Sequence, residues 1–381
     1  MLKFFRLLPR FTVARPLSRA ICFSKMSTSR EPLCPKFIPI DSISKPEGFK
    51  FSIVSYNILA QVYVKSALFP HSPPPCLKWK ARSQATLAVL KGLGADIFCL
   101  QELDEYDSFY KKNIESFGYS SIYVQRGGQK RDGCGIFYKP GSAELIIEEK
   151  IYYNDLICST IQDETASPKT NDDLPASGNK SVDSTNDSEL KSTQTDRGDP
   201  NDPRIRLKRD CVGIMAAFKL KDPSGHHIIV ANTHIYWDPE WVDVKLAQAG
   251  YLLSRLFQFK TRVSEQFGCS PSIIVAGDFN SIPGDQVYTS LMGSHQETPD
   301  ETRVPLCSVY AYTRGEPHFT NCTPGFTGTL DYILFSPSGV LKPVSYLELP
   351  EPESSDVQGG LPNYYHPSDH LPIGAEFHVH Q

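Results

Sequence analysis

The segment Ile273–Ser281, with the sequence IIVAGDFNS, constrains the fold more than any other part of the chain. It begins with four uninterrupted apolar residues, the pattern of a strand that is buried on both faces. Gly277 permits a sharp turn or the close approach of a ligand. Asp278 and Asn280 lie two residues apart on an extended chain and therefore point to the same side. Such a pair is able to hold a hard cation and orient a water molecule, although strand ends also carry Asp and Asn as turn formers.

Length and composition favour a globular protein without a membrane segment. The chain has 381 residues, 40% of them hydrophobic, and a mean hydropathy of −0.30. No apolar run approaches the roughly 20 residues that a membrane-spanning helix needs. Ten cysteines are scattered without a CxxC pair or a zinc-like spacing. In a chain of this length they indicate reduced thiols of an intracellular protein.

The first thirty residues differ in composition from the rest. Residues 1–30 carry seven Lys or Arg, and no acidic residue precedes Glu31. This composition predicts a mitochondrial transit peptide, and the alternative is a disordered basic leader. Met26 offers a second start that would remove most of this segment. The expected location is therefore the mitochondrion, the cytoplasm or both.

A second unusual segment lies in the middle of the chain. Residues 163–203 are rich in Ser, Thr, Asn, Asp and Pro, and they carry ten acidic residues against four basic ones. We expect a disordered insertion within one domain, because such a segment buries too little apolar surface to offset the entropy of ordering. Outside this insertion and the leader, the chain is mildly acidic. It therefore lacks the broad basic surface that binds long duplex nucleic acid, whereas a short single strand or a metal-held ligand remains compatible.

The remaining residues alternate apolar strands with amphipathic helices and predict a single domain over residues 50–380. The predicted class is α+β, a four-layer α/β sandwich of two packed mixed sheets flanked by helices. Helices are expected over 78–93 and 242–267, where apolar residues recur at helical spacing. Strands are expected over 51–59, 96–100, 134–138, 145–158, 210–220, 227–231, 272–276, 330–335 and 371–379.

Polar residues recur just after apolar strands. Each alone has an ordinary structural explanation as a turn, a cap or a solvated strand end. Their recurrence at the same relative place predicts that they converge on one edge of the sandwich. These strand ends are SYN at 55–57, LQE at 100–102, NTH at 232–234, GDFN at 277–280 and SDH at 368–370, with Asp331 at the start of LDYILF.

The residue types at these strand ends favour metal-assisted phosphoryl chemistry. Magnesium prefers a few carboxylate or amide oxygens and leaves positions for water and substrate phosphate. The candidate oxygen donors are Asn57, Glu102, Asp278, Asn280 and Asp369. His370 beside Asp331 would give a carboxylate-oriented imidazole for proton transfer or charge stabilisation. A Ser-His-Asp hydrolase is disfavoured because the chain has no GxSxG motif.

The ordered motifs SYN, LQE, NTH, GDFN, LDY and SDH resemble the endonuclease/exonuclease/phosphatase superfamily over about residues 50–380. Further segments are similar to its carbon-catabolite-repressor-type deadenylase branch, to which nocturnin, angel-type proteins and the oligoadenylate phosphodiesterase are related. These segments are QE at 101–102, RDGCGIFYK at 131–139, WDPE at 237–240 followed by DVK at 243–245, and GFTG at 325–328.

The resemblance implies a role for each strand-end residue. Glu102 would be the main ligand of one magnesium ion, supported by Asn57. Asp278 and Asn280 would bind a second ion and position the attacking water, with Asp369 beside that ion. Asp331 would orient His370, and His234, with Asn232 nearby, would contact the scissile phosphate. Pro239 and Phe326 match the positions that grip the terminal adenine in deadenylases, which agrees with the stacking of single-stranded bases on aromatic faces.

The expected function is that of a magnesium-dependent, poly(A)-specific 3′-exoribonuclease that releases 5′-AMP, with two Mg²⁺ ions, for which Mn²⁺ is an alternative. Its expected partner is single-stranded RNA with a poly(A) 3′ end. One alternative is a phosphatase or phosphodiesterase acting on a small adenine nucleotide such as NADP(H) or 2′,5′-oligoadenylate. Another is a non-catalytic RNA-binding adaptor. The leucine-rich repeats of the founding deadenylases are absent before residue 51, so docking to their large complex through such repeats is not expected.

Overall fold

The computed structural model describes residues 31–40, 48–157, 202–293, 304–337 and 339–380. The predicted leader over 1–30 lies outside the described residues. So does the predicted insertion over 163–203, apart from Asp202 and Pro203, the N-cap and the first residue of helix α4 (Pro203–Arg206). Among the described residues, no helix combines the length and the apolar character that crossing a bilayer requires.

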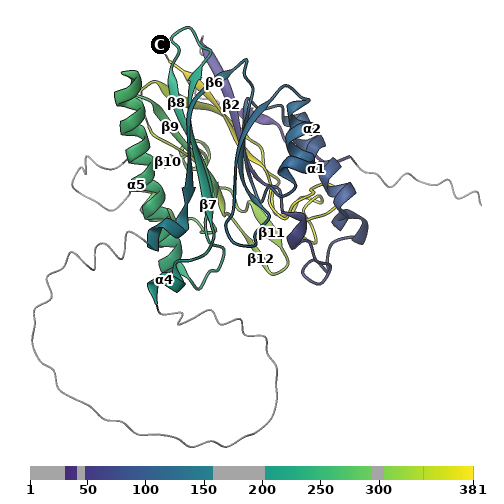
Figure 1. The fold of residues 1–381 in the computed structure, drawn as a ribbon. Helices are drawn as coiled ribbons and strands as arrows, with labels where there is room; N and C mark the ends of the chain where they lie inside the picture. The colour runs from purple at the N-terminus through teal and green to yellow at the C-terminus, as the bar shows by residue number, and fades with distance from the viewer. Residues whose placement is uncertain (1–30, 41–47, 158–201, 294–303, 338, 381) are drawn as a thin grey trace, which may run out of the picture. The chain divides into compact units, whose positions relative to one another are not determined.

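Two mixed β-sheets form the centre of the domain (Figure 1), which confirms the predicted α+β class. The first sheet consists of β1 (Phe37–Pro39), β14 (Leu341–Leu347), β15 (Ile373–Val379), β2 (Phe49–Asn57), β3 (Ile97–Gln101), β5 (Gly133–Tyr138) and β4 (Ser120–Gln125), in that spatial order. The second sheet consists of β10 (Cys307–Ser308), β13 (Asp331–Phe335), β9 (Ser272–Asp278), β8 (His227–His234), β7 (Val212–Leu220) and β6 (Ala143–Tyr152). A separate hairpin pairs β11 (Asn321–Thr323) with β12 (Phe326–Gly328).

Helices cover the outer face of each sheet. Helix α5 (Val242–Phe267) runs along the second sheet, and α1 (Trp79–Leu93) and α2 (Lys111–Glu115) lie against the first, as Figure 1 shows. Within the described residues, further helices are α4 (Pro203–Arg206), α6 (Gln286–Met292) and α7 (Val309–Thr313). Single helical turns occur at Gln61–Tyr63, Pro74–Leu77, Tyr106–Tyr110 and Tyr153–Asp155. The four predicted layers are thus present.

The uninterrupted apolar run of β9 reflects its burial on both faces. Ile274 and Ala276 face the core between the sheets, whereas Ile273 and Val275 pack toward α5. All four side chains are at most 1% exposed. Each large aliphatic side chain buried in this way contributes about 1.5–3 kcal/mol to the hydrophobic stabilisation. This central strand is therefore a rigid support for Asp278 at its end.

Strand register brings the polar strand ends together. His234 on β8 lies opposite Asp278 on the parallel strand β9, and Asp331 on β13 lies opposite the same Asp278 on the other side. In the first sheet, Asn57 on β2 lies opposite Gln101, one residue before Glu102. The polar residues that follow the apolar runs therefore meet at one end of the two sheets.

Gly277 allows the close pairing of β8 and β9 beside the site. A methyl group at Gly277 would lie 2.1 Å from the Thr233 carbonyl oxygen, and its φ is +156°. A larger residue would force the two strands apart. The close approach at Gly277 is therefore that of the neighbouring strand, and not that of a ligand as the sequence suggested.

Candidate active site

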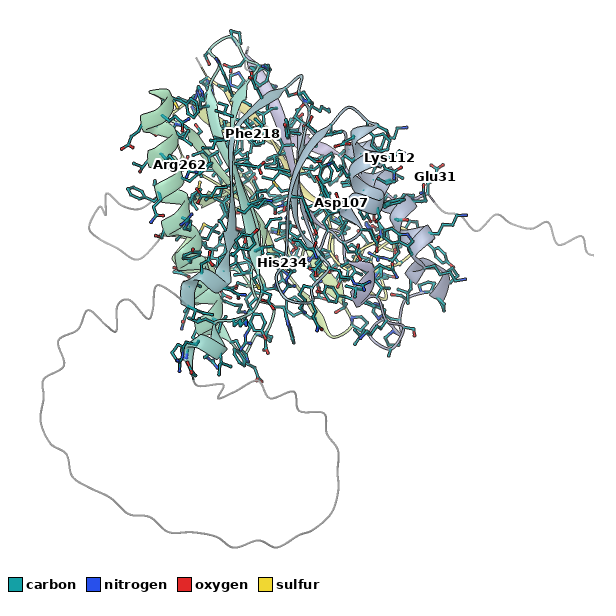
Figure 2. The ribbon with its side chains drawn as sticks, in the orientation of Figure 1. Glu31, Asp107, Lys112, Phe218, His234 and Arg262 are labelled. Carbon is teal, nitrogen blue, oxygen red and sulfur yellow. The ribbon has the colours of Figure 1, made fainter. Side chains whose placement is uncertain are left out.

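The site lies at the end of the sheets where the β11–β12 hairpin is found. Figure 2 shows His234 toward that end and Phe218, a residue of the core between the sheets, toward the other. Residues from both sheets contribute to the site, so the packing of one sheet on the other determines its geometry. The hydroxyl of Ser368 donates to the Asn57 carbonyl oxygen at 2.7 Å and joins the segment before β15 to the end of β2.

Asn57 connects two carboxylates from different sheets. Its Nδ2 donates to Glu102 Oε1 at 3.1 Å and to Asp278 Oδ2 at 3.0 Å. Its Oδ1 accepts from the Leu59 backbone N–H at 3.0 Å, which fixes the orientation of the amide. Because Asn57 is completely buried, these bonds hold the two carboxylates at a defined separation.

Glu102 combines an uncommon backbone conformation with a raised carboxyl pKa. Its φ is +52°, an uncommon value for a residue other than glycine. Its Oε2 accepts from the Ala60 backbone N–H at 2.9 Å. Burial, reinforced by the negative charges of Asp369 and Asp132, raises the pKa of Glu102 to about 8. The surroundings of the Glu102 carboxylate therefore lack enough positive charge to stabilise its ionised form.

Asp278 lies between two histidines. Its Oδ2 is 3.6 Å from His234 Nε2 and 3.6 Å from His370 Nε2. Burial and the charge of Asp331 raise the pKa of Asp278, while both imidazoles oppose that shift. Burial lowers the pKa of His234. The arrangement gives Asp278 a basicity above that of an exposed aspartate.

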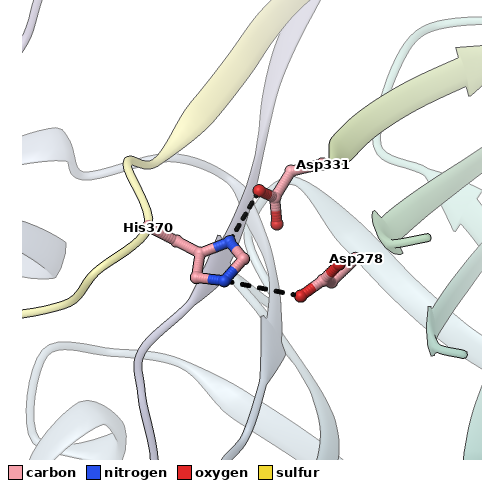
Figure 3. A group of neighbouring side chains, drawn as sticks. All are labelled: Asp278, Asp331 and His370. Carbon is pink, nitrogen blue, oxygen red and sulfur yellow. Dashed lines mark hydrogen bonds and ion pairs between the residues drawn. The ribbon is translucent and has the colours of Figure 1, made fainter. Parts of the chain in front are cut away.

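His370 and Asp331 form a hydrogen-bonded pair (Figure 3), at 2.8 Å between His370 Nδ1 and Asp331 Oδ2. Thr320 donates to the same carboxylate oxygen at 2.6 Å and accepts from the backbone N–H groups of Leu330 and Asp331. Burial disfavours a charge on His370, but Asp331 and Asp278 raise its pKa well above its ordinary value. In the absence of a cation the pair therefore favours the protonated imidazole, whose Nε2 faces Asp278.

The other two candidate asparagines, Asn280 and Asn232, differ in their surroundings. The Asn280 backbone N–H donates to Asp278 Oδ1 at 2.9 Å, and its Nδ2 donates to the Ile235 carbonyl oxygen at 3.1 Å. Asn232 is completely buried. Its Nδ2 donates to the carbonyl oxygens of Leu100 and Gly135, and its Oδ1 accepts from Gln101. These bonds join the two sheets, and a contact between Asn232 and substrate stays a prediction.

Three further predicted residues lie at the periphery. Phe326 is 42% exposed on the β11–β12 hairpin, and Pro239 is exposed in the turn before α5. Asp369 is partly buried beside His370, and its backbone oxygen accepts from the Cys322 N–H at 3.1 Å. The adenine grip predicted for Phe326 and Pro239 stays a prediction.

Sequence reasoning missed the bridge through Asn57 and the contribution of Thr320. Thr320 lies in the segment before β11, in no strand or helix, and is fully buried. No periodic pattern surrounds it, so only the folded structure reveals that it touches Asp331. The other predicted residues lie at the ends of apolar strands, a signal that the sequence carries directly, except Pro239 and Phe326, which the family resemblance supplied.

The donor set fits a hard divalent cation. Oxygen atoms of Asp278 and Asp331 and a ring nitrogen of His370 all lie within 4.8 Å of one another. Asp331 Oδ1 is buried and, within the described residues, has no hydrogen-bond partner. Since the pKa values of Glu102 and Asp278 are both raised, a cation would relieve the excess of buried negative charge. Carboxylate and amide oxygens are also the ligands that magnesium prefers.

Comparisons with known proteins agree with this geometry. The model of the Endonuclease/Exonuclease/phosphatase family matches residues 54–370. Carbon catabolite repressor protein 4 homolog 4 of Arabidopsis thaliana is 62% identical over 338 residues, which cover 87% of this chain and 78% of that protein. The CCR4-Not complex 3′-5′-exoribonuclease subunit Ccr4 of Schizosaccharomyces pombe is 28% identical over 88% of this chain, which spans 50% of that protein.

Solved structures show the same fold. ANGEL2, described as a 2′,3′-cyclic phosphatase and solved with adenosine-2′,3′-vanadate, is 26% identical with a TM-score of 0.66. The alignment covers 91% of this chain and 99% of that one. The human nocturnin catalytic domain with bound sulfate is 22% identical with a TM-score of 0.58 over 91% of this chain and 97% of that one. At that identity the likeness to nocturnin concerns the fold alone.

Proposed function

The chain belongs to the Endonuclease/Exonuclease/phosphatase family, and we propose that it is a metal-dependent 3′-exoribonuclease that shortens poly(A) tails and releases 5′-AMP. Its similarity to 3′-5′-exoribonucleases over nearly the whole described domain supports the nuclease activity. The observation that carries the specificity is the exposed Phe326 ring, on a hairpin that is bonded to the Asp369–His370 segment.

The hairpin connects the base-binding side of the site with the reacting side. Asn321 forms a β-bridge with His370, and the Cys322 N–H donates to the Asp369 carbonyl oxygen. A base stacked on Phe326 would therefore be held at a fixed position relative to the reactive groups. Stacking of this kind contributes about 1–3 kcal/mol per base.

Two divalent cations, proposed to be magnesium, would neutralise phosphate charge and acidify water. Glu102, supported by Asn57, would hold one of them. Asp278 and Asn280 would hold the other, with Asp369 beside it. Protonated His370, oriented by Asp331, would hydrogen-bond the phosphate oxygens together with His234. Asp278 and Asn280 would position the attacking water, and the Asp278 carboxylate would accept its proton. The water oxygen bonds to phosphorus and the bond to the 3′-oxygen breaks. That oxygen takes up a proton and leaves an RNA with a free 3′-hydroxyl and one molecule of 5′-AMP.

A second candidate function is that of a phosphatase or phosphodiesterase on a small adenine nucleotide. The similarity to ANGEL2 favours it, because that structure contains an adenosine-2′,3′-vanadate ligand. A substrate panel separates the two functions. A-tailed RNA, the same RNA with a 2′,3′-cyclic phosphate end, NADPH and 2′,5′-oligoadenylate are each incubated with the full chain and Mg²⁺. Release of 5′-AMP from A-tailed RNA supports the deadenylase, and turnover confined to the other three substrates contradicts it.

The proposed location is the mitochondrion, the cytoplasm or both, based on the basic residues of the first thirty positions and on Met26. N-terminal sequencing of the endogenous protein tests this proposal. An N-terminus at Met26 or upstream of it favours a cytoplasmic form, and one created by cleavage near residue 30 favours import.

A further inference from the structure

The Phe326 ring lies back over a glycine on its own strand. A methyl group at Gly328 would lie 2.8 Å from Cζ of Phe326 and 3.4 Å from Cε1. Residues two apart on a strand share a face, so Phe326 and Gly328 point to the same side of the hairpin. The ring thus occupies the space that any side chain at position 328 would need. Gly328 is required for the observed ring position.

A second exposed apolar side chain reaches the same place from another loop. Cγ2 of Ile282 would lie 3.6 Å from that methyl group at Gly328. Ile282 is 48% exposed and follows Asn280 by two residues, in the loop after β9. Ile282 lies in the loop that follows β9, the strand that carries Asp278. Phe326 lies on the hairpin that is bonded to the Asp369–His370 segment. Their apolar side chains therefore meet beside the reactive groups.

We propose that Phe326 and Ile282 form one apolar surface that receives the terminal adenine, and that Gly328 positions the ring for this contact. The inference rests on the proposed function and adds two residues to it, Ile282 as a base contact and Gly328 as a positioning residue. An aromatic face stacks on the base, and an aliphatic neighbour extends the contact over the width of a purine. A pyrimidine, with its single ring, covers less of this surface.

The hairpin itself is held firmly, so a change at Gly328 acts on the ring. β11 and β12 pair through three residue positions, and Thr323 Oγ1 bonds to both the N–H and the carbonyl oxygen of Phe326. The hairpin is also bonded to Asp369 and His370. Displacing the ring should therefore leave the reactive groups in place and weaken binding of the base.

The chain contains a matched control at Gly325, the residue directly before β12. A methyl group at Gly325 would have no atom within 4 Å, and Gly325 does not have a positive φ. Gly325→Ala and Gly328→Ala therefore add the same group to the same hairpin, but only the second displaces Phe326. Ile282→Ser, at an exposed loop position, tests the aliphatic half of the surface with little risk to folding.

The experiment measures binding and turnover with the full chain. Binding of 5′-AMP and of A-tailed RNA is measured in the Glu102→Ala background, and turnover of RNAs ending in A or U is measured with Glu102 present. For Gly328→Ala we expect at least about fivefold weaker binding, a raised KM with little change in kcat, and a reduced preference for A over U. Ile282→Ser should shift the same quantities in the same direction, and Gly325→Ala should leave them unchanged.

Each outcome bears on the inference separately from the proposed function. Equal binding and equal A-over-U preference in Gly328→Ala and Gly325→Ala would overturn it. If Gly328→Ala does not fold, as judged by thermal unfolding, unchanged binding in Ile282→Ser overturns it instead. If the unmodified chain does not trim A-tailed RNA but binds 5′-AMP, and Gly328→Ala weakens that binding, the proposed function fails and the inference stands. Failure of the unmodified chain to bind either ligand contradicts both.

Discussion

His370 Nδ1 lies 2.8 Å from Asp331 Oδ2, and both side chains are buried. The carboxylate fixes the ring so that Nε2 faces Asp278, and it favours the protonated imidazole. The same carboxylate oxygen is held by Thr320, so its orientation does not depend on His370 alone. We therefore expect this pair to set the pH range over which the site acts.

Replacing Asp331 by Asn should shift the pH dependence of the reaction. Asp331 raises the pKa of His370, so loss of its charge lowers that pKa. The limb of the profile that needs protonated His370 then moves to lower pH, and kcat falls by roughly 10²–10⁴-fold at neutral pH. The measurement is kcat/KM against pH. Thr320→Ser, which keeps the hydroxyl, is the control, and an unmoved limb in Asp331→Asn would show that His370 does not act as a cation.

The metal-free protein should lose stability as pH rises from about 5 to about 8. Burial and neighbouring charges raise the pKa of Glu102 from 4.5 to about 8 in the folded state. Between these values the folded state holds a proton that the unfolded state has released, so stability falls with increasing pH. Thermal unfolding in a chelator measures this trend. Added Mg²⁺ should reduce it at pH 8, because cation binding competes with the proton.

Glu102→Gln provides the control for that pH dependence. It replaces the carboxylate by a neutral amide of the same shape, so the decline between pH 5 and 8 should become smaller. Turnover should be lost in the same variant. A decline identical to that of the unmodified protein would assign the effect to another group, such as Asp278, whose pKa is also raised.

Asn57→Ala should separate the two carboxylates that Asn57 joins. Its amide donates to Glu102 at 3.1 Å and to Asp278 at 3.0 Å. Among the described residues, no other side chain has hydrogen bonds to both carboxylates. Loss of these bonds inside a buried site costs about 1–3 kcal/mol of stability in the absence of metal. The apparent Kd for Mg²⁺, measured by calorimetry, should rise. Unchanged stability and unchanged metal affinity together would argue against the bridge.

Leu256→Ala tests the packing that supports the site from the outer side. Leu256 lies on the face of α5 that packs against the second sheet, and it is completely buried. Truncation of a buried leucine costs about 2–5 kcal/mol, measured as the free energy of unfolding in urea. Gln258→Ala, on the exposed face of the same helix, should change it little. Equal effects of the two changes would contradict the assigned orientation of α5.

The buried strands and the long helix could be predicted because their patterns are strong. The prediction over 272–276 falls within β9, and the one over 242–267 coincides with α5. β14 was missed because Leu341–Leu347 contains Pro343, and the strands of the β11–β12 hairpin are only three residues long. Short or interrupted strands form only because neighbouring strands pair with them, which periodicity does not reveal.

For the site, the sequence identified the residues at strand ends but not their connections. Asp278 and His234 follow apolar runs, so their convergence could be expected. The hydrogen bond from Thr320 to Asp331 depends on the path of the segment before β11. No local sequence pattern encodes that path. The inter-sheet bonds of Asn232 likewise depend on the packing of the two sheets.

The most direct test of the proposed activity is the release of 5′-AMP from an A-tailed RNA by the full chain, followed with and without Mg²⁺ and in the Glu102→Ala variant. We expect stepwise shortening of the tail that stops at the body of the RNA, requires the metal and is abolished in the variant. Undiminished shortening by Glu102→Ala, or turnover of small adenine nucleotides with none of A-tailed RNA, would contradict it.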